Sequence, residues 1–265
     1  MLPSQRTEGG FTRAVAVIPA RYASTRFPGK PLADLLGRPM IAWVVAACLE
    51  ARSLAGVYVA TDHEGIADAA RKAGATAVMT PPDLASGTDR VALAAEGIDA
   101  DVFINVQGDE PAIDPRDLDL LAGAFGGANP PRMATLARAA GPGTDFSSPD
   151  VVKLVRARNG DALYFSRCAI PYRRDAEGGA PTLIHVGVYA YTAESLKLFA
   201  RMDVSPLERT EKLEQLRALE AGWRIRVLDA LGLPGVGVDR PEDMARATAL
   251  LLERGFSKCV PNSFS

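Results

Sequence analysis

The sequence predicts an α/β protein with a mostly parallel β-sheet, helices on both faces and a partly antiparallel sheet insertion. In the first half, short apolar runs alternate with amphipathic helical patterns, which is typical of βαβ units. From about Met133 this rhythm changes to closely spaced strand-like runs, and helical periodicity returns at Pro206. Hydrophobic residues make up 48% of the 265 residues, which is enough to bury a sizeable core.

The first half is expected to hold four strands and four helices. Each expected strand is a short apolar run, and the helices repeat apolar residues every three or four positions, as Ile41, Val44 and Cys48 do. Parallel strands joined by such helices form a sheet that is covered on both faces. The expected strands are 13–19, 56–62, 75–80 and 101–111, and the expected helices are 41–49, 64–74, 89–97 and a segment around 118–125.

The second half is expected to open with an insertion at about residues 133–205. We assign one domain to residues 14–254, with residues 1–13 and 255–265 as flexible tails. The expected strands are 132–140, 151–157, 162–166 and 183–192, followed by a helix at 206–221, a strand at 224–230 and a helix at 241–254.

Composition and charge exclude several classes of protein. The formal net charge is -2, which argues against a general nucleic-acid or membrane-surface binder. No apolar run approaches the ~18 residues of a membrane span, and the first residues lack the apolar core of a signal peptide. Cys48, Cys168 and Cys259 are far apart without CxxC spacing, which favours reduced thiols and excludes a zinc site. We therefore expect a cytoplasmic protein.

Three cations lie on a short loop directly after the first expected strand, in "IPARYASTRFPGKPL". They are Arg21, Arg26 and Lys30, and prolines stiffen the loop between them. The loop lacks the GxGxxG pattern, and Pro31 after Lys30 excludes the Walker motif. Ligands of open α/β sheets bind at the carboxyl ends of strands, where this loop lies. A polyanionic phosphate fits these cations, and a merely basic surface loop is the alternative.

This loop and seven later motifs together resemble the 3-deoxy-manno-octulosonate (Kdo) cytidylyltransferases, over about residues 14–252. The later motifs follow in the family's order: "VATDHEGIADAA", "SGTDR", "VFINVQGDEP", "ALYFSRCAIPY", "HVGVYAY", "SPLERTEKLEQLRAL" and "GVDRPEDM". The resemblance implies a Rossmann-like nucleotidyltransferase fold and transfer of CMP from CTP to the anomeric hydroxyl of Kdo, with release of pyrophosphate. It also implies Mg²⁺, a homodimer, a role in lipopolysaccharide synthesis, and an insertion that supplies part of the sugar site and the dimer interface.

The resemblance implies a nucleotide site built from the first loop and the "SGTDR" motif. Arg21 and Lys30 match triphosphate-binding positions and would stabilise the leaving pyrophosphate. Simple helix capping by Ser86 or Thr88 is the alternative for the second motif, where Asp89 replaces the family's usual Glu. The implied nucleotide-binding residues are Pro19, Ala20, Arg21, Lys30, Ser86, Gly87, Thr88 and Arg90.

Asp109 and Asp239 each follow an apolar run and each precede a proline by two positions. Either could be a strand-end turn or a helix N-cap, since Asp-x-Pro places an acceptor before a helix. If both follow strands of one sheet, they can meet at its rim. The matching family positions hold Mg²⁺ against CTP, and Mg²⁺ prefers a few carboxylates plus phosphates and waters. We therefore expect Asp109 and Asp239 to be the metal ligands and, with Arg21 and Lys30, the catalytic residues.

The resemblance also implies a sugar site. Glu211, Glu214 and Gln215 would share one helix face, and the family's Glu–Gln pair contacts sugar hydroxyls. Arg167 is expected to bind the sugar carboxylate, with His185 beside it. The implied sugar-binding residues are Gln107, Arg167, His185, Tyr189, Glu214 and Gln215, whereas His63 is interpreted as a strand-end turn residue and Glu211 is left open.

Two alternative functions stay open at this point. One is a cytidylyltransferase for another acidic sugar, such as 8-amino-Kdo or a sialic acid. The other is a regulatory module that binds a nucleotide or sugar without catalysis, although Lys30, Asp109 and Asp239 are all present. The segments "RFPG", "IPYRR" and "VDRP" depart from the family's usual pattern and could alter substrate preference.

Overall fold

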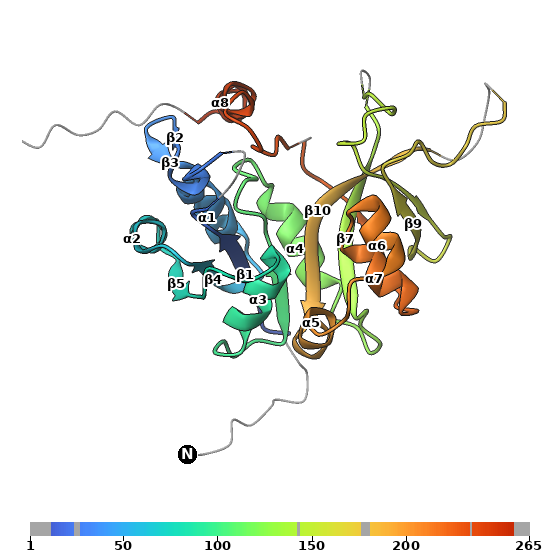
Figure 1. The fold of residues 1–265 in the computed structure, drawn as a ribbon, viewed down its shortest axis with the longest axis horizontal. Coiled ribbons are helices and arrows are strands. Elements are labelled where there is room, and N and C mark those ends of the chain that lie inside the picture. Colours follow the sequence, from blue (N-terminus) through green and yellow to red (C-terminus); the bar gives the residue numbers. More distant parts are fainter. Residues whose placement is uncertain (1–11, 24–26, 142–143, 176–180, 234, 257–265) are drawn as a thin grey trace, which may run out of the picture.

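The computed structural model describes residues 12–23, 27–141, 144–175, 181–233 and 235–256. Arg26, Cys259 and most of the two expected tails lie outside these ranges. The described residues form one large sheet with helices on both faces, and a short hairpin beside it (Figure 1). The predicted α/β class with a mostly parallel sheet is therefore confirmed.

The large sheet has nine strands, of which seven follow the order β11-β7-β10-β6-β1-β4-β5. Four neighbouring strands (β6, β1, β4 and β5) are parallel, and β10 inserts antiparallel between β6 and β7. The expected antiparallel strands thus continue the central sheet. The strands are β1 (Ala14–Ala20), β4 (Leu54–Thr61), β5 (Thr76–Met79), β6 (Val102–Asn105), β7 (Met133–Ala139), β8 (Lys153–Arg156), β9 (Ala162–Ser166), β10 (Leu183–Thr192) and β11 (Ile225–Asp229).

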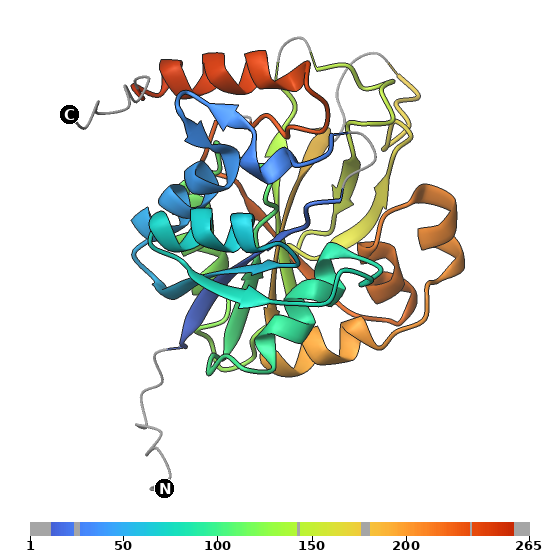
Figure 2. The same cartoon turned by 60° about the vertical axis from the view of Figure 1, so that its left-hand side comes forward.

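Both faces of the sheet are buried, and the alternate residues of β1 show this because they enter two different cores. Ala16 and Ile18 pack into the core beneath α1, α2 and α4, whereas Val15 and Val17 pack into the core beneath α3, α5 and α7 (Figure 2). The helices are α1 (Met40–Glu50), α2 (Glu64–Lys72), α3 (Gly87–Ala95), α4 (Pro115–Gly123), α5 (Ala193–Ala200), α6 (Pro206–Glu211), α7 (Gln215–Glu220) and α8 (Asp243–Glu253).

A smaller core lies beneath the C-terminal helix. Trp43 of α1 and Leu251 of α8 pack there together with Val238, which precedes α8. Leu35 packs against them from a hairpin of two short strands, β2 (Asp34–Leu35) and β3 (Arg38–Pro39). A short 3-10 helix, η1 (Lys30–Leu32), precedes this hairpin. Among the described residues, no helix combines the length and the hydropathy needed to cross a membrane.

Two features of the helical region differ from the sequence-based prediction. The helix expected at 206–221 is interrupted at Lys212, which adopts a left-handed conformation (φ 54°) and separates α6 from α7. Helix α5 was not predicted, because only Leu196 and Phe199 of its eight residues combine apolar spacing with deep burial. Its start signal was Thr192, whose side chain accepts a hydrogen bond from the Ser195 N–H.

Candidate active site

A cavity of about 290 Å³ opens at the carboxyl ends of β1 and β6. This is the rim where the sequence placed the ligand crevice. The cavity carries charges of both signs, with three cationic and two acidic side chains. Its described lining residues are Pro19, Ala20, Arg21, Lys30, Pro31, Leu84, Ala85, Ser86, Gly87, Arg90, Gln107, Gly108, Asp109 and Asp239.

The loop after β1 closes on itself and delivers Lys30 to the cavity. The Gly29 N–H donates to the Tyr22 carbonyl at 3.0 Å, and Gly29 has the left-handed φ of 69° that favours glycine. The Tyr22 ring stacks on His63, with ring centroids 4.1 Å apart. His63 lies between the end of β4 and α2, where it is the N-cap and accepts from the Gly65 N–H, which agrees with its interpretation as a strand-end turn residue.

Lys30 lies between the two predicted metal ligands. Its Nζ is 2.6 Å from Asp109 Oδ2 and 3.7 Å from Asp239 Oδ1, and it also donates to the Val238 carbonyl at 2.8 Å. The Lys30 side chain is only 15% exposed, so these contacts act in a partly desolvated setting. The ammonium thus brings both carboxylates to one point of the cavity.

The two aspartates reach this point by different routes. Asp109 lies in the turn after β6, as expected, whereas Asp239 does not follow a strand, and that part of the prediction is wrong. Asp239 lies on the irregular segment between β11 and α8, whose Val238 N–H donates to the Asp109 carbonyl at 2.9 Å. Neither aspartate is a helix N-cap, because Asp114 occupies that position in α4 and Glu242 in α8.

The pair of carboxylates fits a divalent cation that also binds a substrate phosphate. Asp109 Oδ2 and Asp239 Oδ1 both lie within 3.7 Å of one cationic atom, so they already converge on a positive charge. No group of three or more His, Cys, Asp or Glu side chains that could hold a metal occurs in the described ranges. Mg²⁺ does not need such a cage, since it commonly uses one or two carboxylates together with phosphates and waters.

The "SGTDR" motif begins α3 at the cavity wall. Ser86 accepts from the Asp89 N–H, and the Asp89 carboxylate accepts from the Ser86 N–H, which completes a capping box. The capping role considered for Ser86 is therefore confirmed, and Asp89 serves it in place of Glu. The N–H groups of Gly87 and Thr88 are not used by this box, so they remain suited to bind an anion.

Arg90 contributes charge to the cavity but is tightly held. Its guanidinium is 3.4 Å from Asp62 Oδ2 and also donates to the Thr80 hydroxyl. Burial lowers the pKa of Arg90, and the nearby Arg21 lowers it further, while Asp62 opposes both effects. Arg90 is thus a fixed cation in the cavity wall. No sequence pattern indicated that Asp62 would pair with it.

A chain of polar side chains leads from the cavity towards the predicted sugar residues. Gln107 donates to Asn105 at 3.2 Å, Asn105 donates to Thr88 at 3.4 Å, and the Thr88 hydroxyl donates to Glu214 at 2.7 Å. Gln107 lines the cavity, whereas Thr88 does not and lies between the two predicted sites. Asn105, which is fully buried, was not predicted as a site residue.

His185 and Tyr189 lie together on β10, with ring centroids 5.3 Å apart. Burial lowers the pKa of His185 to about 3, so its imidazole is neutral near pH 7. Thr135 donates its hydroxyl hydrogen to the Val188 carbonyl and so accepts from His185 Nε2 at 3.0 Å. His185 therefore offers Nδ1 as an acceptor, which suits a sugar hydroxyl better than a carboxylate.

Arg167 lies at the end of β9 and is braced by backbone carbonyls. Its Nε donates to the Glu211 carbonyl at 2.6 Å and its Nη1 to the Pro149 carbonyl at 2.7 Å. Ion pairs among the described residues do not include Arg167, so its charge is not neutralised by a carboxylate there. Among the described residues no hydrogen bond joins Arg167 to His185, and the expectation that His185 lies beside Arg167 in a sugar site stays a prediction.

The expectation that Glu211, Glu214 and Gln215 share a helix face is wrong. The break at Lys212 leaves Glu211 at the end of α6, where it accepts from the Ser166 hydroxyl at 2.7 Å and from the Arg167 N–H. Glu214 precedes α7 and Gln215 begins it. Gln215 is 3% exposed, and its Nε2 is buried without a hydrogen-bond partner, which leaves a donor for a ligand oxygen.

Glu110 is the acidic residue that the sequence reading missed, although it stands in "QGDEP" directly after Asp109. Burial raises its pKa to about 7, and the neighbouring charges of Asp109 and Asp239 add to the effect. Its carboxylate lies against the segment before Asp239, because a Cβ at Gly235 would be 2.9 Å from Glu110 Oε2. The charge of Glu110 therefore depends on pH close to neutrality, next to the candidate metal ligands.

This pKa predicts a pH-dependent stability. The folded protein keeps the Glu110 proton up to about pH 7, whereas the unfolded chain loses it near pH 4.5. Rising pH between these values therefore favours the unfolded chain. Glu110→Gln should remove this loss, so from pH 5 to pH 8 the variant should gain about 1–3 kcal/mol relative to the parent in urea unfolding. The exposed control Glu96→Gln should differ from the parent by the same free energy of unfolding at every pH. The same pH-independent difference for Glu110→Gln would contradict the raised pKa of Glu110.

Comparison with known proteins agrees with this geometry. A family model described as "Cytidylyltransferase" matches residues 15–225. The chain is 51% identical to a 3-deoxy-manno-octulosonate cytidylyltransferase of Anaeromyxobacter dehalogenans, over 90% of this chain and 98% of that one. It is 50% identical to the enzyme of the same name from Myxococcus xanthus, over 92% of this chain and 98% of that one.

Solved structures give the same result. The structure of a CMP:2-keto-3-deoxy-manno-octonic acid synthetase complexed with CTP has a TM-score of 0.86 and 41% identity, covering 92% of this chain and 100% of that one. An inositol-1-phosphate CTP transferase from T. maritima, with a TM-score of 0.65 and 15% identity, shares the fold alone. The chain therefore belongs to the cytidylyltransferase family, and within it to the 3-deoxy-manno-octulosonate cytidylyltransferases.

Proposed function

We propose that this protein transfers CMP from CTP to the anomeric hydroxyl of 3-deoxy-D-manno-octulosonate, giving CMP-Kdo and pyrophosphate. The observation that carries the proposal is the placement of Lys30 between Asp109 and Asp239 in a charged cavity at the rim of the sheet. The names of the relatives support the choice of CTP and Kdo.

The reaction makes one bond and breaks another. The anomeric oxygen of the sugar attacks the α-phosphorus of CTP, and its hydroxyl proton passes to the solvent. The bond from this phosphorus to the bridging oxygen breaks, and pyrophosphate takes the electron pair. Negative charge then develops on the leaving group. Arg21 and Lys30 line the cavity and would stabilise this charge, which is how preorganised cations lower such a barrier.

Asp109 and Asp239 are the residues that would hold Mg²⁺ at the CTP phosphates. When bound, Mg²⁺ would offset charge on the α-phosphate and favour the ionised form of the attacking hydroxyl. The single charge of Lys30 offsets only part of the charge of the two carboxylates, and binding of a metal and a triphosphate would redistribute these charges. The N–H groups of Gly87 and Thr88 at the start of α3 complete the anion-binding surface.

The sugar would bind next to Gln107, on the side of the polar chain that ends at Glu214. Arg167 carries a charge without a carboxylate partner among the described residues and suits the sugar carboxylate. Gln215 offers its buried Nε2, and the Tyr189 hydroxyl stays protonated because burial raises its pKa. His185 would accept from a sugar hydroxyl rather than bind the carboxylate.

Three further properties are part of this proposal. A homodimer, in which the insertion around residues 133–205 supplies part of the interface, rests on the likeness to the family. A role in lipopolysaccharide synthesis follows from the product, an activated Kdo. A cytoplasmic location follows from the need for CTP. Turnover of CTP with a panel of acidic sugars, including 8-amino-Kdo and a sialic acid, tests the substrate.

Lys30→Ala should lower turnover at saturating CTP by roughly two to three orders of magnitude, the usual size for loss of one preorganised charge-stabilising group. The fold should persist, because a loop cation adds little to the core. Pyrophosphate release measures the rate and circular dichroism the fold, with the exposed Lys72→Ala as the control. A folded variant with near-normal turnover would refute the role in leaving-group stabilisation.

Asp109→Asn and Asp239→Asn should each fold, lose most turnover and need at least about tenfold more Mg²⁺ for half-maximal rate, because each removes one ligand charge. Turnover measured over a range of Mg²⁺ concentrations tests this, with the exposed Asp68→Asn as the control. Normal Mg²⁺ dependence combined with reduced stability would instead indicate a purely structural role for these aspartates.

Arg167→Ala and Gln215→Ala should weaken binding of the sugar acid far more than binding of CTP. Loss of a charged hydrogen-bond partner costs about 1.5–3 kcal/mol, or roughly 10- to 150-fold in affinity. Titration calorimetry with CTP alone, and with Kdo plus a nonreactive CTP analogue, separates the two ligands. Equal losses of affinity for the sugar acid and for CTP would show that the assignment of Arg167 and Gln215 to the sugar site is wrong.

A further inference from the structure

The segment between β11 and α8 carries Asp239 to the cavity. We call its described residues, 230–233 and 235–239, the strap. The strap has no regular secondary structure and contains Gly232, Gly235 and Gly237. Because glycines leave a backbone conformationally free, the position of the strap must come from its contacts with the body of the protein.

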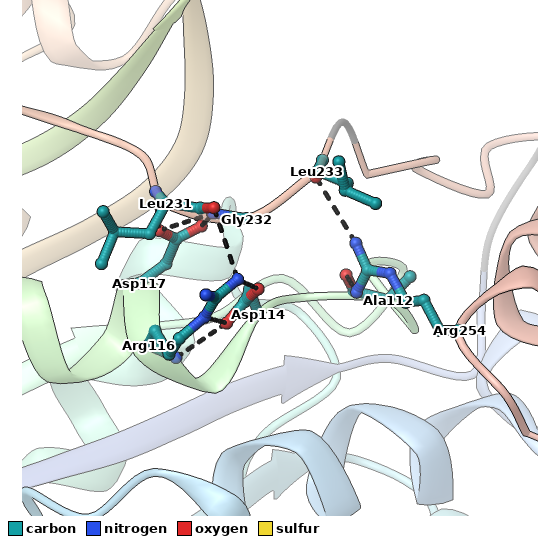
Figure 3. A network of polar contacts seen from close by, with 8 residues as sticks. All are labelled: Ala112, Asp114, Arg116, Asp117, Leu231, Gly232, Leu233 and Arg254. Carbon is teal, nitrogen blue, oxygen red and sulfur yellow. Dashed lines mark hydrogen bonds and ion pairs between the residues drawn. The ribbon is translucent and has the colours of Figure 1, made fainter.

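The first part of the strap is fastened by a buried carboxylate. Asp117 of α4 is 2% exposed, and its Oδ1 accepts from the Leu231 N–H at 2.6 Å and from the Gly232 N–H at 3.3 Å (Figure 3). Burial raises the pKa of Asp117, and these two N–H donors oppose the rise. Asp117 is not part of the cavity, so the proposed reaction gives this buried acid no role.

Two arginines hold the carbonyl side of the same stretch. Arg116, which pairs with Asp114 at 2.7 Å, donates to the Leu231 carbonyl at 3.4 Å. Arg254, which follows the last residue of α8, donates to the Leu233 carbonyl at 3.4 Å and also to the carbonyl of Ala112 (Figure 3). Hydrogen bonds thus hold the first part of the strap through its backbone N–H groups and through its backbone carbonyl groups.

Close approach confirms that the strap is pressed against acidic side chains. A Cβ at Gly232 would lie 2.6 Å from Asp114 Cβ and 2.9 Å from Asp117 Oδ2. A Cβ at Gly237 would lie 3.2 Å from Glu110 Oε1. A side chain at position 232 would therefore shift the strap or the start of α4, whereas one at position 237 would require only a small movement of the Glu110 carboxylate.

The strap ends at the metal pair. The fully buried Val238 donates its N–H to the Asp109 carbonyl at 2.9 Å and accepts from Lys30 Nζ at 2.8 Å. Beyond it, the Asp239 N–H donates to the Asp243 carboxylate of α8 at 3.0 Å. The end of the strap at Asp239 is therefore held by Lys30, Asp109 and Asp243, and its start is held by Asp117.

We propose that Asp117, acting through the strap, is a positioning residue that places the Asp239 carboxylate for the metal bound with CTP. This inference rests on the proposed function, in which Asp239 is a metal ligand. Removal of the Asp117 carboxylate frees the Leu231 and Gly232 N–H groups and loosens the strap. The carboxylate of Asp239 then spends less time in the arrangement that a metal needs, although the ligand itself is still present.

The test compares Asp117→Ala with the parent in the full-length protein. Mn²⁺ binding, measured by electron paramagnetic resonance with a nonreactive CTP analogue present, should weaken roughly three- to tenfold, less than the 10- to 100-fold typical of a residue that contacts a metal ligand directly. The Mg²⁺ concentration for half-maximal turnover should rise by the same factor. Amide hydrogen exchange should accelerate in peptides that contain the strap.

Asp119→Ala is the matched control. Asp119 lies on the same helix and accepts from the Ser53 N–H at 2.8 Å and the Ser53 hydroxyl at 2.6 Å, away from the strap. It should leave Mn²⁺ binding and strap exchange unchanged. Asp117→Asn keeps an acceptor oxygen for the strap, so it should restore most of the Mn²⁺ affinity that Asp117→Ala loses.

Two results would overturn the proposal. In the first, Asp117→Ala accelerates strap exchange but leaves Mn²⁺ binding unchanged. In the second, Asp119→Ala weakens Mn²⁺ binding as much as Asp117→Ala does. If Asp117→Ala does not fold, Gly232→Ala decides, since it displaces the strap while Asp117 stays, and unchanged Mn²⁺ binding would then refute the proposal. Failure of the proposed metal role is distinguishable, because Asp239→Asn would itself bind Mn²⁺ normally.

Discussion

The contact of one ammonium group with two carboxylates organises the whole site. Lys30 lies 2.6 Å from Asp109 and 3.7 Å from Asp239, in a cavity where two carboxylates alone would repel each other. Its three members come from the loop after β1, the turn after β6 and the segment before α8. Different contacts place each of these segments. The fold must therefore hold three separate segments of the chain in fixed positions at the rim of the sheet.

Close backbone packing at the rim makes this register possible. A Cβ at Gly108 would lie 2.9 Å from the Pro19 carbonyl, so the turn after β6 can approach the end of β1 only with glycine there. The parallel pairing of β1 and β6 brings these turns to the same edge. The cavity is thus a direct consequence of sheet topology and small residues.

Most of the fold could be predicted because the buried faces of helices and strands appear in the sequence as apolar residues at regular spacing. The strands and long helices follow apolar spacing, and the residues that line the cavity, such as Lys30 and Asp109, stand in motifs at strand ends. Periodicity carries no record of the left-handed Lys212 that divides α6 from α7, nor of the irregular segment that brings Asp239 to the rim. The neutral state of His185 and the raised pKa of Glu110 depend on burial among distant segments, which a single sequence does not show.

The hydrogen-bonded chain Gln107–Asn105–Thr88–Glu214, whose two middle members are buried, links the nucleotide and sugar halves of the candidate site. A buried polar side chain is costly unless its hydrogen bonds are made, so a linked set of such side chains permits few alternative arrangements. Gln107 faces the cavity that suits the nucleotide, and Glu214 precedes the helix that carries the sugar candidate Gln215. Phosphoryl transfer requires the attacking oxygen in line with the leaving group, and a displacement of about 1 Å can cost roughly 100-fold in rate. In the proposed function, this polar link between the two halves would help to hold a sugar hydroxyl in line with the α-phosphate of CTP.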